Sequence, residues 1–527
     1  ENADEEEKSG EVAEVPEDEL ALQELEEENQ IAAFSASQPV TTFKGLQDAL
    51  ADETCSEIQV SGTISVTETL IVNRAVTISG GTLVRGIRDK YLIEVVGSNG
   101  KLALQGIVID GQSESCKEAE PLINVNEGGS LTLRDGATLQ NNHANKWGSA
   151  IRVSDGSLLM EGGTIQDNVC TLAGGGIYLY PSASFKMTGG TIQRNTSNSG
   201  GGIYAQCQVS MTGGTISENT AVSGGGVYIV ANGNPAGLVM SGGSITWNHA
   251  VDKNGGGDGG GVYLMNSSAT LTLNGGTIGD NIADGWGGGI RNLGSVTING
   301  GKIVNNKGES GGGIRNEKTV TMTGGEISGN KSTKWSGGGF YNGSTFVMSG
   351  GSIIGNTAKT YGGGINQQGT FKVSGTVKIT DNHGEGEINN VSLDSKHYVT
   401  IVSPGLSGGS QIGVNINPNK DLNITQAIND KDYSAYFTSD DSNYKVVDVE
   451  SDGKHQVSLK KTGNDSGNTG SGESGGSTGG NTDGSESGGT TGGNNSGTTG
   501  GNTGNTSGST TGTSTGTSSG GSSAGTA

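Results

Sequence analysis

The sequence predicts an all-β chain wound into a solenoid of about 25 residues per coil, and three observations support this. The motif GGTISEN, which ends at Asn219, recurs with small changes along the middle of the chain. A second motif, GGGI or GGGV followed by one large residue, falls between its copies. The aliphatic residue of the first motif returns at intervals of 24 to 33 residues, which is the period of a repeat architecture.

The residue types of the repeat favour strands over helices. Its units are rich in Gly, Thr, Ser and Asn, which are poor helix formers. Short β-branched runs bounded by Gly and Asn turns predict two or three strands in each coil. Equivalent positions of successive coils then stack about 4.8 Å apart, the spacing between paired strands.

A ladder of asparagines is predicted where the first motif ends. Each side-chain amide both donates and accepts, so stacked amides can satisfy one another inside a solenoid. The predicted column consists of Asn142, Asn168, Asn195, Asn219, Asn248, Asn281, Asn306, Asn330, Asn356 and Asn382.

The alternation of GGGIY with TIxxN resembles the paired short motifs of the polymorphic outer-membrane protein repeat. That repeat belongs with the pectate-lyase-like right-handed parallel β-helices, and the resemblance covers about residues 130 to 385. It implies a right-handed coil. It implies little about function, because the fold hosts lyases, hydrolases and adhesins alike. We expect an adhesin-like protein, secreted or on the cell surface, with a Gram-positive cell wall as its location.

Composition and charge narrow the function classes. The 527 residues are 30% hydrophobic and 4% aromatic with 99 Gly, which suits a solenoid better than a large globular core. The net charge of −23 argues against nucleic acid and anionic membranes as partners. No apolar run is long enough to cross a bilayer, so we expect no direct membrane insertion. We expect a monomer with no cofactor and no metal.

Both ends of the chain differ from the repeat. Residues 1–38 form an acidic leader, with fourteen acids among the first 30 residues, and are expected to be disordered. Residues 39–386 are predicted to form the β-helix. Residues 387–461 carry more aromatics and predict a small C-terminal β cap or subdomain. Residues 462–527 are almost entirely Gly, Ser, Thr and Asn, which predicts a disordered linker.

A helix is predicted at the start of the β-helix. In TTFKGLQDALAD, residues 41–52, Phe43, Leu46 and Leu50 share one face at helical spacing. The resemblance implies that this helix covers the open end of the first coil, where strand edges and core would otherwise be exposed.

The four cysteines leave their pairing open. Cys170 and Cys207 fall at different corners of the coil, which argues against a bond between them. A Cys55–Cys116 bond and free buried thiols both remain alternatives.

The carboxylates and histidines do not predict a catalytic site. Acid–base chemistry on sugars needs paired carboxylates on neighbouring coils. The candidate acids occupy different repeat positions or distant coils, and each histidine after a ladder asparagine is also isolated; these residues are Asp110, Asp135, Asp155, Asp167, Asp280, Asp284, His143, His249 and His383. We therefore name no catalytic residue.

One outward-facing column does carry binding chemistry. In GGGIY the aliphatic residue points inward, so the next residue points outward. Tyr suits sugar rings or a protein epitope, whereas the alternative is that the rings and cations stack only to stabilise the sheet. The column consists of Arg152, Tyr178, Tyr204, Tyr228, Tyr263, Arg291, Arg315, Tyr341 and Asn366. A second aromatic patch is predicted just before the glycine turns, from Trp147, Trp286, Trp335 and Tyr361.

These features favour a binding protein that presents an extended face to a host or environmental glycan or protein. The ligand-binding residues are predicted to be Tyr178, Tyr204, Tyr228, Tyr263, Arg291, Arg315, Tyr341, Trp286 and Trp335. Two alternatives remain, a polysaccharide lyase or glycoside hydrolase of the pectate-lyase-like class, and a structural surface stalk.

Overall fold

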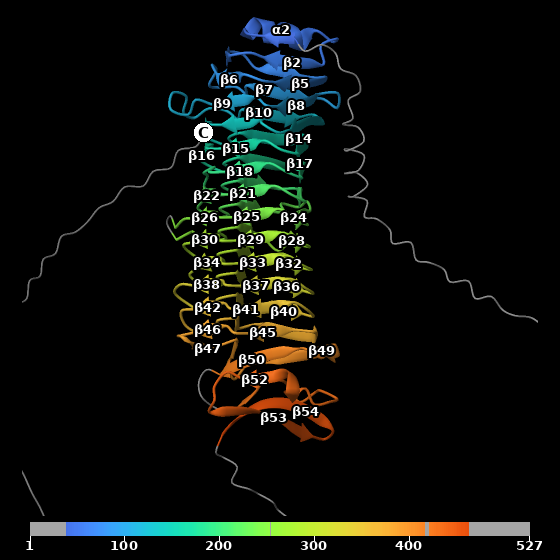
Figure 1. Cartoon of the computed structure of the whole chain (residues 1–527), viewed down its shortest axis with the longest axis vertical. Helices are drawn as coiled ribbons and strands as arrows, with labels where there is room; N and C mark the ends of the chain where they lie inside the picture. The colour runs from blue at the N-terminus through green and yellow to red at the C-terminus, as the bar shows by residue number, and fades with distance from the viewer. Residues whose placement is uncertain (1–37, 253–254, 417–420, 463–527) are drawn as a thin grey trace, which may run out of the picture. The chain divides into compact units, whose positions relative to one another are not determined.

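The computed structural model describes residues 38–252, 255–416 and 421–462, and these residues form a parallel β-helix. Its coils stack in chain order along one axis (Figure 1). The predicted acidic leader and C-terminal linker lie outside the described residues, apart from Gln38 and Thr462. None of the helices in the described ranges is long and apolar enough to span a membrane.

Each regular coil has three main strand positions, which we call faces A, B and C. Face A consists of β4 (Leu70–Val72), β7 (Ile93–Val96), β10 (Ile123–Asn126), β14 (Ile151–Met160), β17 (Ile177–Met187), β19 (Ile203–Ala205), β23 (Val227–Ile229), β27 (Val262–Leu264), β31 (Ile290–Asn292), β35 (Ile314–Asn316), β39 (Phe340–Asn342), β43 (Ile365–Gln367) and β48 (Val391–Leu393). The long strands β14 and β17 continue into face B.

Face B follows face A along each coil. It consists of β1 (Gln38–Val40), β2 (Glu57–Val60), β5 (Ala75–Ser79), β8 (Lys101–Gln105), β11 (Gly129–Leu133), the ends of β14 and β17, β20 (Gln208–Met211), β24 (Ala236–Met240), β28 (Ala269–Leu273), β32 (Ser295–Ile298), β36 (Thr319–Met322), β40 (Thr345–Met348), β44 (Thr370–Gly375) and β49 (Val399–Leu406).

Face C carries the TI of the first motif. It consists of β3 (Thr63–Val66), β6 (Thr82–Arg85), β9 (Val108–Asp110), β12 (Thr138–Gln140), β15 (Thr164–Gln166), β18 (Thr191–Gln193), β21 (Thr215–Ser217), β25 (Ser244–Thr246), β29 (Thr277–Gly279), β33 (Lys302–Val304), β37 (Glu326–Ser328), β41 (Ser352–Ile354), β45 (Lys378–Thr380), β50 (Gln411–Ile416) and β52 (Phe437–Ser439).

A fourth, two-residue strand follows the ladder asparagine, and we call the column of these strands ladder D. It consists of β13 (His143–Ala144), β16 (Val169–Cys170), β22 (Thr220–Ala221), β26 (His249–Ala250), β30 (Ile282–Ala283), β34 (Lys307–Gly308), β38 (Lys331–Ser332), β42 (Thr357–Ala358), β46 (His383–Gly384) and the antiparallel β47 (Glu387–Ile388). The sequence predicted two or three strands per coil, so ladder D adds a further one.

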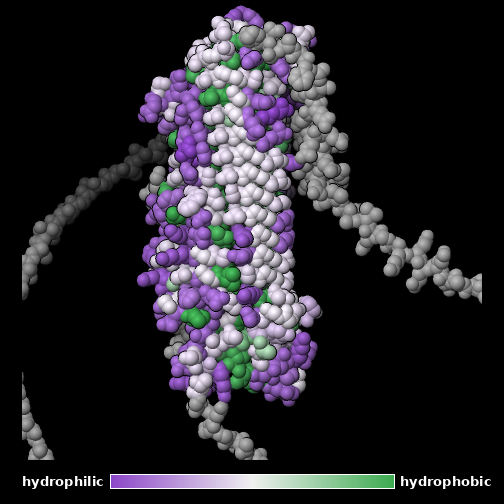
Figure 2. Space-filling model, in the orientation of Figure 1, coloured by the Kyte–Doolittle hydropathy of each residue, from purple (hydrophilic) through white to green (hydrophobic). Residues whose placement is uncertain are grey.

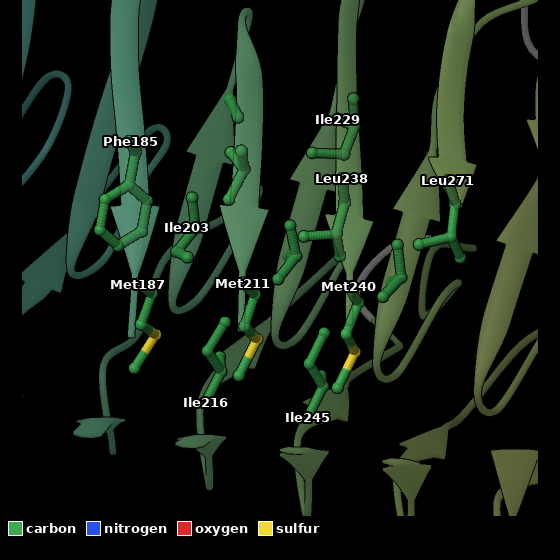
Figure 3. Close-up of a cluster of buried hydrophobic side chains, with 14 of the residues drawn as sticks. Phe185, Met187, Ile203, Met211, Ile216, Ile229, Leu238, Met240, Ile245 and Leu271 are labelled. Carbon is green, nitrogen blue, oxygen red and sulfur yellow. The ribbon is translucent and has the colours of Figure 1, made fainter. Parts of the chain in front are cut away.

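The core is one continuous aliphatic column because equivalent residues stack in register. Met187, Met211 and Met240 are directly paired on face B, and all three are buried. Figure 3 shows their side chains beside Ile216 and Ile245 of face C. Each coil thus buries a few aliphatic residues against its neighbours, which is how a chain with little apolar content forms a stable core.

The predicted N-terminal helix is present as α2 (Phe43–Ala51). Thr42 caps it by accepting a hydrogen bond from the Gly45 amide at 3.1 Å. Leu46 is buried, and Phe43 and Leu50 pack against the core. The helix contacts the first strands of the solenoid and lies at their open end (Figure 1).

At the other end, parallel pairing continues past the predicted boundary at residue 386. β48 pairs with β43 and β50, and β50 pairs with β52. An antiparallel sheet of β51 (Leu422–Asn423), β54 (Lys454–Lys461) and β53 (Tyr444–Ser451) follows, with the 3-10 helix η1 (Ser434–Tyr436) before β52. The repeat motifs end before the solenoid does, because the last coils differ in length from the regular ones.

The glycine triplets allow the coils to approach one another. Gly224 has a φ of +64°, a conformation that side chains with a Cβ rarely adopt. A Cβ on Gly225 would lie 2.6 Å from the Gly260 carbonyl oxygen and 2.7 Å from the His249 carbonyl carbon. The repeated GGG therefore reflects close backbone packing as well as a turn.

The asparagine ladder is confirmed. All ten predicted residues are fully buried. In a typical step, the Asn219 amide N and Nδ2 donate to Asn248 Oδ1 at 3.0 and 2.9 Å. The Asn219 Nδ2 also donates to the Ile192 carbonyl at 2.9 Å, so the ladder links the side chains to the backbone of face C.

Charged groups end the ladder on both sides. Arg85 Nε donates to Asn142 Oδ1 at 3.1 Å. At the other end, Asn382 donates to Asn390, whose Nδ2 donates to Asp440 Oδ1 at 2.7 Å. The amide oxygens point toward the guanidinium and the N–H groups toward the carboxylate. Each charge therefore complements the sum of the amide dipoles.

A second, shorter ladder lies inside face A and was not predicted. Asn292 Nδ2 donates to Asn316 Oδ1 at 2.8 Å, and Asn316 and Asn342 each donate to the next residue at 2.9 Å, ending on Gln367 Oε1. These four side chains are fully buried. The sequence signal was the third residue in IRN, IRN, FYN and INQ.

The cysteines do not form the 55–116 bond that the sequence left open. Cys116, Cys170 and Cys207 carry free thiols. Cys170 and Cys207 are buried, and burial raises the pKa of both.

Candidate ligand-binding face

The residues predicted for the outward column do lie in one column on face A. Arg152 pairs with Tyr178, and the register continues through Tyr204, Tyr228 and Tyr263. The same column then passes through Arg291, Arg315, Tyr341 and Asn366. We call these nine residues the outer face A column.

The four tyrosine rings of the column pack against one another. The centroids of Tyr178 and Tyr204 are 4.8 Å apart, and those of Tyr204 and Tyr228 are 5.1 Å apart, with nearly parallel planes. Tyr263 meets Tyr228 edge-on at 5.1 Å. Tyr178 and Tyr228 are only 6% and 8% exposed. The ring faces of Tyr178, Tyr204 and Tyr228 are therefore taken up within the stack and are not free to pack against a sugar. Burial raises the pKa of all four hydroxyls, which keeps them protonated as donors.

The two arginines of the column are paired with acids. Arg291 lies 3.4 Å from Asp258 and 3.3 Å from Glu317, and Arg315 Nε donates to Glu317 at 2.8 Å. Both guanidinium groups also lie over the Trp286 ring, at 5.1 and 4.5 Å from its centroid. Because of this pairing, this part of the column does not present two unpaired positive charges.

The tryptophans of the second aromatic patch lie in three different places. Trp147 is 39% exposed and lies 6.2 Å from the Tyr178 ring, at the N-terminal end of the tyrosine stack. Trp286 lies among the arginines. Trp335 is 52% exposed and lies beside Lys334. Trp147 therefore belongs with the tyrosines, and Trp335 with a different set of side chains.

A pocket opens at the N-terminal end of the column, and we call it the Trp147 pocket. It has a volume of about 410 Å³ and is lined by Thr69, Asp89, Lys90, Tyr91, Glu94, Glu120, Lys146, Trp147 and Arg152.

Arg152 organises the Trp147 pocket. Its Nη1 donates to the Tyr91 hydroxyl oxygen at 3.1 Å, and its guanidinium lies 5.1 Å from the Tyr180 centroid. Its Nε is buried and has no hydrogen-bond partner among the described residues. Lys146 and Glu120 lie 3.6 Å apart, and Glu94 accepts a hydrogen bond from Asn124. The wall thus combines two aromatic rings with oppositely charged groups.

Sequence reasoning missed Tyr91 and Glu94. Glu94 precedes Asn124 and Arg152 in the same outward column, so extending the column toward the N-terminus would have found it. Tyr91 lies in the loop between β6 and β7, where no repeated motif fixes its position.

Three of the six candidate carboxylates, Asp110, Asp167 and Asp284, are held in separate local contacts. Asp110 accepts hydrogen bonds from Gln140 and Asn141, and Asp167 pairs with Arg194 at 2.8 Å. Asp284 pairs with His249 at 2.9 Å on ladder D. Within the ranges that the structure describes, no group of three His, Cys, Asp or Glu residues is arranged to hold a metal ion.

Comparison with known proteins agrees with the fold. A family model described as a right handed beta helix region matches residues 105–299. No curated protein and no solved structure matches the chain. The matched region holds the tyrosine part of the outer face A column, and the parallel pairing continues beyond it. The described residues thus form a parallel β-helix of the right-handed type, as the resemblance of the repeat motifs implied.

Proposed function

We propose that this chain is a surface-exposed binding protein that holds an extended glycan along face A. The observation that supports it most is the continuity of the outer face A column, which runs through nine coils and opens into the Trp147 pocket. Solenoids commonly bind along such extended faces, because each coil repeats the same contact.

The Trp147 pocket has the chemistry that a sugar ring needs. Trp147 offers a partly exposed apolar ring, and Tyr91 and Arg152 offer hydrogen-bond donors beside it. Its volume lies within the usual range of small-ligand pockets. Acids and cations are balanced three to three among its lining residues, which favours a neutral or zwitterionic sugar over a highly charged one.

The tyrosine stack would contact the rest of the glycan through hydroxyls. Because the rings of Tyr178, Tyr204 and Tyr228 stack nearly parallel, their hydroxyls would form a row with one donor per coil. An extended glycan lying along the axis could then repeat one hydrogen bond at each coil, about every 4.8 Å. Secretion and a Gram-positive cell-wall location belong to the same proposal, and the resemblance of the repeat motifs supports them. A protein ligand on face A is the alternative to a glycan.

The test starts from a glycan array on the full chain and continues with variants against the strongest ligand. We expect Trp147→Ala to weaken binding by about 2 kcal/mol, because hot-spot aromatics contribute on that scale. Trp247→Ala is the matched control, since Trp247 is 61% exposed and precedes a ladder asparagine instead of lining face A. Equal losses in both variants would contradict the proposal.

A second pair of variants separates binding from stacking. Tyr204→Phe with Tyr228→Phe keeps the ring stack and removes two hydroxyls. We expect weaker glycan binding by about 1 kcal/mol per hydroxyl with an unchanged melting temperature. Unchanged affinity would mean that the stack only stabilises the sheet.

A further inference from the structure

Ladder D carries a pair of lysines in an unfavourable arrangement. Lys307 of β34 and Lys331 of β38 are direct register partners. Both side chains are exposed, and neither forms an ion pair in the described part of the chain. Like charges directly opposite one another destabilise a sheet. Nothing in the fold requires lysine here, because the same slot holds Thr220, Ile282 and Thr357 in other coils.

An open groove includes Lys331 in its lining, and we call it the lysine groove. It has a volume of about 850 Å³ and is lined by Lys331, Ser332, Thr333, Lys334, Thr357, Ala358, Lys359, Thr360, Glu385 and Gly386. Figure 2 shows hydrophilic side chains gathered along the side of the solenoid where ladder D runs, on the left of the view.

Two of the three groove lysines are available to a ligand. Lys334 pairs with Glu309 at 2.9 Å. Lys331 and Lys359 are exposed and have no ion-pair partner among the described residues. The hydroxyls of Ser332, Thr333 and Thr360 already form hydrogen bonds. The charged groups of the lining are then three lysines and one carboxylate, that of Glu385, so the groove keeps a net positive charge.

The local charge is opposite to that of the whole chain. Residues 301–385 contain nine Lys and Arg and five Asp and Glu, a net charge of 9 − 5 = +4, whereas the chain carries −23. A cationic region on an otherwise acidic protein attracts anions locally and repels them elsewhere. Trp335, which is 52% exposed beside Lys334, adds an apolar ring at the edge of this region.

We propose that the lysine groove binds an anionic polysaccharide through Lys331 and Lys359, with Trp335 packing against a sugar ring. Lys307, the strand partner of Lys331 on the preceding coil, would extend this contact beyond the groove. The sulfate or carboxylate groups of the polysaccharide would relieve the repulsion between the paired lysines. Ladder D and face A are separate strand columns of the coil, so this site is independent of the glycan proposed for face A. Nucleic acid and anionic membranes are less suitable, because they are bound through larger basic clusters than this groove offers.

The experiment compares two double variants of equal charge in the full chain. Lys331→Gln with Lys359→Gln removes the free cations of the groove. Lys318→Gln with Lys372→Gln is the control, since both residues are exposed and lie away from ladder D. The probes are heparin for sulfate, polygalacturonate for carboxylate, dextran as a neutral polymer, and a DNA oligonucleotide, each at low and moderate salt.

We expect wild type and control to bind heparin or polygalacturonate, with weaker binding at higher salt and no binding of dextran. The groove variant should lose about tenfold in affinity or more, since two charge-assisted contacts disappear. Preference between the two anionic probes identifies sulfate or carboxylate as the group recognised. Equal losses in groove variant and control, or stronger binding of DNA than of both polysaccharides, would overturn the proposal.

Thermal melting gives a second readout that does not depend on affinity. Without polysaccharide, Lys331→Gln should melt at the same temperature as wild type or slightly higher, because a like-charge pair is relieved. The anionic probe should raise the melting temperature of wild type more than that of the groove variant at the same probe concentration. A markedly lower melting temperature of Lys331→Gln without probe would assign the lysine a structural role instead.

Discussion

Two blocks of face A share one backbone and differ in chemistry. From β17 to β27 the outer residues are tyrosines and the inner column is apolar, with Leu179, Ala205, Ile229 and Leu264. From β31 to β43 the outer residues begin with two arginines and the inner column is Asn292, Asn316, Asn342 and Gln367. Both sides of the sheet change at the same step, where Tyr263 pairs with Arg291 and Leu264 with Asn292.

This switch shows that a column in a solenoid must complement itself. The backbone register passes through the step without a shift. An isolated amide among leucines would lack a partner, whereas four consecutive amides satisfy one another. The first amide of the block is satisfied locally, because Asn292 Oδ1 accepts from the Gly294 amide at 2.9 Å. Column chemistry therefore changes in blocks.

The largest expected effect concerns the first asparagine ladder, which runs through the coils of both blocks. Asn248→Ala removes the acceptor of two Asn219 donors and frees the acceptors of its own Nδ2. We expect the free energy of unfolding to fall by about 3 kcal/mol or more, because buried polar groups are left unsatisfied. Chemical denaturation measures this. Asn299→Ala, at an exposed turn, is the control and should change little.

Next in size is a test of the block rule itself. Asn316→Leu should cost about 2–3 kcal/mol, since it leaves Asn292 Nδ2 and Asn342 Oδ1 without their partner. Ile229→Asn should cost a similar amount, because its register partners are Ala205 and Leu264.

Replacing all four amides of the second ladder by Leu or Ile should cost less than four times the single change. No side-chain amide is then left unpaired, and the column resembles that of the tyrosine block. The remaining loss comes from the backbone amides of Gly294 and Lys318, which no longer have their side-chain acceptors. Additive losses in the fourfold variant would break the comparison between the blocks.

Much of the fold could be predicted because the repeated residues act through the backbone. Asn219 and its equivalents recur at one slot in every coil, so their stacking follows from the period alone. The second ladder was missed because it spans only four coils. Only the outward-facing residue of each strand, such as Arg291, was considered, and not the inward-facing residue that follows it, such as Asn292. Glu317 was missed as the partner of the arginines because it lies in a turn, outside the repeated slots.

The candidate sites were less predictable for a similar reason. Tyr91 comes from an irregular early coil, and no period places it beside Arg152. Lys307 and Lys331 do occupy a regular position, directly after a ladder asparagine. Their pairing depends on the register of ladder D, a strand position that the sequence did not predict. The repeat predicts which residues stack in a column, but it does not predict which loop residues lie beside that column.

A smaller effect is expected at the C-terminal end of the ladder. Burial raises the pKa of Asp440 to about 6, although Asn390 donates two hydrogen bonds to its carboxylate. The folded state then binds more protons than the unfolded state between about pH 4 and pH 6, so stability should fall as pH rises through this window. Asp440→Asn should remove up to about 2 kcal/mol of that pH dependence. Parallel pH profiles of wild type and variant would contradict this.

The smallest expected effect concerns the residue directly before each ladder asparagine, which differs between the early and the late coils. This residue adopts a left-handed conformation, with φ of +57° at Glu218, +60° at Trp247 and +64° at Gly355. Late coils fill the slot with Asn, Gly or Asp, whereas early coils also use Arg, Glu and Trp. A left-handed residue with a Cβ costs about 1 kcal/mol, and glycine avoids this cost while it loses more entropy on folding.

Glu218→Gly should therefore stabilise the chain by about 0.5–1 kcal/mol. Gly355→Glu should destabilise it by a similar amount, and sterics do not confound this change, since a Cβ at Gly355 would have no atom within 4 Å. Reciprocal shifts in chemical denaturation midpoints would show that the early corners carry strain that the late corners lack. If Glu218→Gly destabilises while Gly355→Glu is neutral, side-chain contacts of the early corners outweigh backbone conformation, and the two halves differ in packing instead of strain.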